Sequence, residues 1–117
     1  MAKEEAGRYE VVITSSAEFH FYELVEYLYE HLSLDRAEEA TRELSEMTLG
    51  LDLLYHRGSP EKKLSQRKKS YRYLLYKRTS RATVKVLYYV DEKSKTVYVT
   101  DFFPTEKDPK KIASRNR

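Results

Sequence analysis

The sequence predicts an α+β fold with the element order β-α-α-β-β-β, in which a helical hairpin packs on one face of a mostly antiparallel four-stranded sheet. Two observations predict it. A helical period of apolar residues follows a short β-branched segment, and three β-type segments then follow one another closely, at residues 71–77, 83–90 and 96–103. Connections as short as those between the last three segments force neighbouring antiparallel strands.

The size and composition of the chain favour one folded domain. Its 117 residues are enough for one hydrophobic core and too few for two, so we expect a single domain over residues 1–117. The polar stretches 1–7 and 110–117 are expected to be flexible tails. The chain has no cysteine, no apolar signal segment near its start and no run of membrane-spanning length, which predicts a cytoplasmic protein with no membrane partner.

The first strand and the first helix are predicted from a change of period. Residues 9–14 are short and β-branched, as in a strand. Ser15 and Glu18 then have the spacing of a capping box, in which the two side chains satisfy free N–H groups at a helix start. A helical stripe over residues 17–32 follows, made of Phe21, Leu24, Val25, Leu28 and Leu32.

A second helix is predicted to begin after Ser33, a suitable N-cap, and to run to about His56. Its apolar stripe consists of Ala37, Thr41, Leu44, Met47 or Thr48, Leu51 and Tyr55. Almost nothing separates the two helices, so they should form an antiparallel hairpin. Gly50 within the second helix indicates either close packing against the sheet or a mild kink.

The remaining chain is a basic connection and three strands. Residues 57–70 read as a loop in which only Leu64 offers apolar anchorage. In the middle strand, Val84, Val86, Tyr88 and Val90 alternate as the core face. The opposite face of that strand, with Lys85, Leu87 and Tyr89, is expected to be open and partly exposed.

Charge is strongly segregated along the chain. Residues 1–59 hold 5 Lys and Arg against 13 Asp and Glu, whereas residues 60–117 hold 17 against 6. Cations on the predicted strands and their turn are expected to converge on one patch for a polyanion, and these are Arg72, Lys77, Arg78, Arg81 and Lys85. Cations of this kind bind phosphates, and a neighbouring tyrosine such as Tyr89 stacks on a base. The alternative is a solvated basic sheet edge that resists aggregation.

Other kinds of site find little support. The histidines, His20, His31 and His56, have no metal-ligand spacing with the acidic residues and are expected to be surface residues. With 3 glycines the chain has no glycine-rich phosphate loop. We therefore expect no metal, no cofactor and no small-molecule substrate.

The order and spacing of these segments resemble the RelE/ParE superfamily, the toxins of type II toxin–antitoxin systems that include plasmid stabilisation proteins. The resemblance covers about residues 9–112. It is carried by Ser16-Ala17-Glu18 at a helix start, by residues 71–75, 84–92 and 97–99 on strands, and by Asp108-Pro109 near the end. It implies a growth-inhibiting toxin that a cognate antitoxin neutralises. The target would be either mRNA on the ribosome or DNA gyrase.

The resemblance also implies residue roles. Lys85 matches an arginine common in the third strand of the messenger-RNA interferases, and Arg72 matches a second-strand lysine, so these two are the candidates for catalysis. Leu74 stands where the interferases have a second lysine, and Pro104 and Thr105 stand where the last strand usually delivers histidine or arginine. RNA cleavage needs an acid and a base as well as cations.

The acid and base would have to come from less suitable residues. Asp101 or Glu106 would serve as the base, although Asp101 is better suited to pairing with a cation and Glu106 to a solvated turn. Whether the chain is an endoribonuclease therefore stays open, with a non-nucleolytic or gyrase-directed action ranked first. The alternative functions are a non-toxic nucleic-acid-binding module and a partner-binding module on the same fold. For a site on the open face, Lys85→Ala should reduce activity and leave the melting temperature nearly unchanged.

Overall fold

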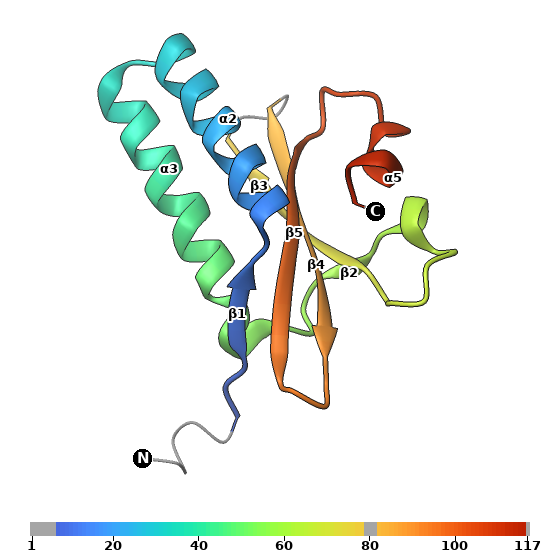
Figure 1. Ribbon diagram of the computed structural model, residues 1–117. Helices are drawn as coiled ribbons and strands as arrows, with labels where there is room; N and C mark the ends of the chain where they lie inside the picture. Colours follow the sequence, from blue (N-terminus) through green and yellow to red (C-terminus); the bar gives the residue numbers. More distant parts are fainter. Residues whose placement is uncertain (1–6, 79–81, 117) are drawn as a thin grey trace.

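The structure is a computed structural model that describes residues 7–78 and 82–116. A five-stranded sheet has the strand order β1-β5-β4-β3-β2, and two long helices pack side by side against one of its faces (Figure 1). The strands are β1 (Glu10–Ile13), β2 (Ser59–Pro60), β3 (Arg72–Lys77), β4 (Thr83–Asp91) and β5 (Thr96–Pro104). The α+β class with helices on a sheet is therefore confirmed. The prediction of four strands is wrong, because residues 59–60 add a short edge strand, and the sheet is mixed because β1 runs parallel to β5.

The helical hairpin consists of α2 (Ser15–His31) and α3 (Leu34–Leu49). Thr14, not Ser15, caps α2, since its hydroxyl accepts a hydrogen bond from the N–H of Ala17 at 3.1 Å. Ser33 caps α3 as predicted, accepting from the N–H of Arg36 at 3.3 Å. The second helix does not continue to residue 56.

Gly50 ends α3, and a separate turn, α4 (Leu51–Leu54), follows it. A Cβ at this glycine would meet only the carbonyls of Glu46 and Met47, at 3.3 and 3.4 Å, and no strand. Close packing against the sheet is therefore not the reason for the glycine. The helix is interrupted there between α3 and α4, so a mild kink is the one of the two expected alternatives that remains.

The main core lies between the hairpin and the sheet. The predicted helical stripes are buried at Leu24, Leu28, Leu44 and Leu51. They pack against the inner face of the strands, formed by Val84, Val86, Tyr88, Val97, Val99 and Phe102. Val90 is partly buried against the same cluster, so the predicted core face of the middle strand is confirmed.

The opposite face of the sheet is not fully open, contrary to expectation. The short helices η1 (Lys62–Leu64) and α5 (Lys111–Arg115) cover one end of it and bury a second cluster with Leu87 and Phe103 (Figure 1). Leu64 and Ile112 supply the apolar side chains, each 1% exposed. Residues 110–116 are thus a packed segment and not a flexible tail. Their polar sequence hid this, because a single isoleucine provides the apolar contact.

Gly58 offers a stability test of the junction between α4 and β2. Its N–H donates to the buried hydroxyl of Tyr88 at 2.9 Å, and burial raises the pKa of that phenol. A Cβ at position 58 would lie 2.4 Å from the Tyr88 oxygen and 2.8 Å from the carbonyl oxygen of Tyr73. We expect Gly58→Ala to lower the free energy of unfolding by about 2 kcal/mol, measured by urea denaturation. Gly7→Ala is the matched control, since nothing lies within 4 Å of its Cβ position, and equal stability of the two variants would contradict this account.

Candidate nucleic-acid interface

Side chains alternate along each strand, so every second one faces away from the two long helices. In the β3–β4 pair, Tyr73 lies opposite Leu87 and Leu75 lies opposite Lys85. Directly opposed residues of an antiparallel pair share one face. Because Leu87 belongs to the second cluster, this face is the one turned away from α2 and α3.

A β-bulge in β5 brings a further tyrosine to this face. Leu87 pairs with Asp101 while the next residue, Tyr88, pairs with Val99, so Thr100 is the extra residue. A bulge of this kind reverses the alternation beyond it. As a result Tyr98 lies opposite Tyr89 on the outward face, where simple alternation from Asp101 would have turned it inward.

Four half-buried tyrosines, Tyr71, Tyr73, Tyr89 and Tyr98, form a surface that we call the tyrosine face. The ring of Tyr89 stacks on that of Tyr98 with centroids 5.1 Å apart, and it meets the ring of Tyr71 edge-on at 5.4 Å. The ammonium of Lys69 lies 4.7 Å from the centroid of the Tyr89 ring. Aromatic rings next to cations, arranged along a sheet, are suited to stacking bases and contacting phosphates of a single strand.

Lys85 lies at this face but its charge is already paired. Its Nζ is 2.7 Å from a carboxylate oxygen of Glu61, whose side chain is 2% exposed, and 4.3 Å from the ring centroid of Tyr73. The other Glu61 oxygen accepts the N–H of Lys63 at 3.0 Å. Lys85 therefore neutralises a buried carboxylate and offers little free charge to a ligand.

Arg72 does not join Lys85, which corrects the expected convergence. It pairs with Tyr88, on the core face of the sheet, and its guanidinium donates to the carbonyl of Gly58 at 2.5 Å. The two candidates for catalysis thus point to opposite sides of the sheet.

The other predicted cations are also distributed. Lys77 is exposed and lies opposite Thr83, on the outward side of β3. Arg78 follows it and lines a cavity on the helix side. Arg81 lies outside the described residues. The patch on the tyrosine face is therefore smaller than the set of five cations that the sequence suggested.

Neither acid–base candidate offers a carboxylate at the tyrosine face. Asp101 is fully buried, with its carboxylate 2.7 Å from Nη2 of Arg115 and 3.0 Å from Nδ2 of Asn116. Glu106 is exposed and lies in the turn that follows β5. No group of three or more potential metal ligands occurs within residues 7–78 and 82–116.

Sequence reasoning missed Glu61 and the four-tyrosine arrangement. Glu61 is an isolated acidic residue directly before the cations of residues 62–69, and that isolation is the signal that could have identified it as a countercharge. Tyr98 could not be placed, because the bulge that turns it outward has no distinct signature in the sequence.

The comparisons with known proteins add no relative to this description. No family model matches the chain, and no match was found among curated proteins or among solved structures. Within the described residues, no helix has the length and apolar character needed to cross a membrane.

Proposed function

We propose that this chain is a toxin of the RelE/ParE type that acts on the translation or replication machinery, and that its tyrosine face contacts a single nucleic-acid strand. The observation that carries the proposal is the stack of Tyr89 and Tyr98 with Lys69 beside it. The element order of strand, helical hairpin and three antiparallel strands supports the same family. The protein would act in the cytoplasm.

The action is proposed to be non-nucleolytic, with DNA gyrase as the favoured target over mRNA. Lys85 is paired with Glu61, Arg72 lies on the other side of the sheet and Asp101 is held by Arg115. None of these three is available to move a proton or stabilise a phosphorane at the tyrosine face. A nucleic-acid-binding module without toxicity is the second candidate, favoured by the same tyrosines.

Expression of the chain alone, followed by pulse labelling of protein and DNA synthesis, tests the proposal. We expect growth to stop, with DNA synthesis falling before protein synthesis. Normal growth with undiminished labelling would refute the toxin proposal and leave the binding module. An early fall in protein synthesis alone would move the target to the ribosome.

A cognate antitoxin is proposed to cover the helical hairpin as well as the sheet. A groove of about 230 Å³ lies between α2, α3 and β1, and exposed Tyr22 and Leu49 lie at its edge. Amphipathic helices commonly bind in such grooves through apolar anchors. Hydrogen exchange in the complex should show protection on both α2 and β4.

The contribution of the tyrosine face can be measured directly. We expect Tyr89→Ala to weaken binding of a single-stranded oligonucleotide about tenfold, because one stacked base contributes about 1–3 kcal/mol. The measurement is a fluorescence anisotropy titration at several salt concentrations, where the salt slope should stay unchanged. Tyr22→Ala, on the exposed surface of α2, is the control; equal losses for both variants would place the interface elsewhere.

A further inference from the structure

A second candidate site lies away from the tyrosine face, between α2 and the end of β5. A cavity of about 330 Å³ is enclosed between α2, the ends of β3, β4 and β5, and the segment that follows β5. Its floor is apolar and includes Leu24, Val84 and Phe102, which are all buried. Pockets for small ligands typically have volumes of about 300–1,000 Å³, and this cavity lies near the lower end of that range.

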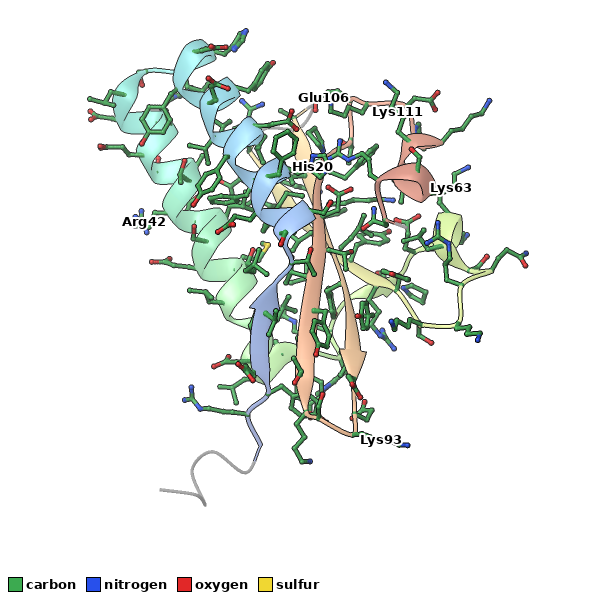
Figure 2. The ribbon with its side chains drawn as sticks, viewed as in Figure 1. His20, Arg42, Lys63, Lys93, Glu106 and Lys111 are labelled. Atoms are coloured by element: carbon green, nitrogen blue, oxygen red, sulfur yellow. The ribbon has the colours of Figure 1, made fainter. Side chains whose placement is uncertain are left out.

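Charged side chains line this cavity above the apolar floor. In Figure 2, His20 on α2 and Glu106 after β5 lie in the same upper part of the molecule, and both line the cavity. His20 is held by Glu23, with Nδ1 and Oε1 3.0 Å apart. Arg115 is held by Asp101. Each of these residues therefore already has a hydrogen-bond partner.

Three other charged side chains of the lining have no such partner within the described residues. The side chains of Arg78, Lys107 and Glu106 line the cavity and make no hydrogen bond or ion pair with any other residue of 7–78 and 82–116. Of these three side chains, two are cations and one is a carboxylate. A phosphate monoester, which carries about −1.5 to −2 charges at pH 7, complements this set, and a guanidinium binds phosphate through two parallel hydrogen bonds.

The other lining groups favour a nucleotide over a simple aliphatic anion. The carboxylates of Glu23 and Glu106 and the ring of His20 can bond to amino and hydroxyl groups, which a base and a ribose supply. An aliphatic anion would fill the floor but would offer no hydrogen-bond donor to Glu106 or to the second carboxylate oxygen of Glu23.

We propose that this cavity binds a nucleoside monophosphate, with the base on the apolar floor and the phosphate on Arg78 and Lys107. The nucleotide is either free or the phosphorylated end of an RNA strand. The inference goes beyond the proposed function and does not depend on it, because none of the four tyrosines of the tyrosine face lines the cavity. Toxicity and cavity binding can therefore fail separately.

The test is a titration of the purified full chain with adenosine 5′-monophosphate, followed by amide NMR shifts. Shifts are expected at the cavity, in α2 around His20 and in residues 105–107. Arg78→Ala should weaken binding about tenfold, the loss expected for a charge-assisted contact. Arg42→Ala is the matched control, since it removes the same charge from an exposed site on α3 (Figure 2), and should change binding less than about twofold.

The nature of the ligand is tested with three further probes. Adenosine without phosphate should bind about tenfold more weakly than the monophosphate. If a 5′-phosphorylated trinucleotide shifts the same amides and binds with higher affinity than the monophosphate, the ligand is the end of a strand. If the trinucleotide binds with lower affinity, the ligand is the free nucleotide. The proposal is overturned if adenosine binds equally well, if Arg78→Ala and Arg42→Ala behave alike, if no cavity amide shifts, or if a peptide carboxylate displaces the nucleotide.

Discussion

Asp101→Ala is expected to lower the free energy of unfolding by about 3–4 kcal/mol, because it leaves a largely buried guanidinium without its countercharge. The side chain of Arg115 is 14% exposed and that of Asp101 is 0% exposed, at a separation of 2.7 Å. The carboxylate also accepts a hydrogen bond from Asn116. Both partners belong to the C-terminal segment, so the loss should appear first as weaker hydrogen-exchange protection of α5.

The matched control for Asp101 is a solvent-exposed ion pair of the same protein. Arg8 and Asp52 are 3.1 Å apart, but their side chains are 54% and 29% exposed. Asp52→Ala should therefore cost less than about 1 kcal/mol in the same urea titration. If the two alanine variants lose similar stability, the buried pair does not hold the C-terminal segment in place.

The elements with a regular period were predictable from the sequence. The stripes that contain Leu24, Leu28 and Leu44 were expected at the core and are buried there. The alternation of residues in the middle strand correctly predicted that Val84 and Val86 face the core. In each case one apolar face repeats several times, and the burial of that face determines the register.

The candidate site was harder to predict, because it depends on which face each strand residue occupies. Arg72 and Lys85 are both strand cations, and only the β3–β4 register shows that they face opposite ways. Applying the period of two across that register would have separated them. Tyr98 is different, because the bulge at Thr100 moves its side chain to the opposite face of the sheet. No local sequence pattern predicts that bulge.

The polar segments were the least predictable part. Residues 57–70 and 110–116 each present one buried apolar residue, Leu64 and Ile112, among charged neighbours. A single apolar side chain gives no period. Their burial depends on each other and on Leu87 and Phe103, which are distant in the sequence.

The second large effect concerns Lys85, where the structure reverses the expectation of unchanged stability. Lys85→Ala would leave the carboxylate of Glu61, with a side chain 2% exposed, without its cation at 2.7 Å. We expect a loss of about 3 kcal/mol in the free energy of unfolding, with a matching fall in the melting temperature. Any loss of toxicity in this variant would then reflect unfolding as much as a missing contact.

The double variant Lys85→Met with Glu61→Leu separates these effects, because it removes both charges and keeps apolar volume at the site. Replacing a buried pair by apolar residues is often neutral, so most of the lost stability should return. Net charge is unchanged, and binding of a single-stranded oligonucleotide should stay within about threefold of the original chain, with the same salt slope. A stable double variant that binds far more weakly would show instead that Lys85 contacts the nucleic acid, and would return this residue to the centre of the site.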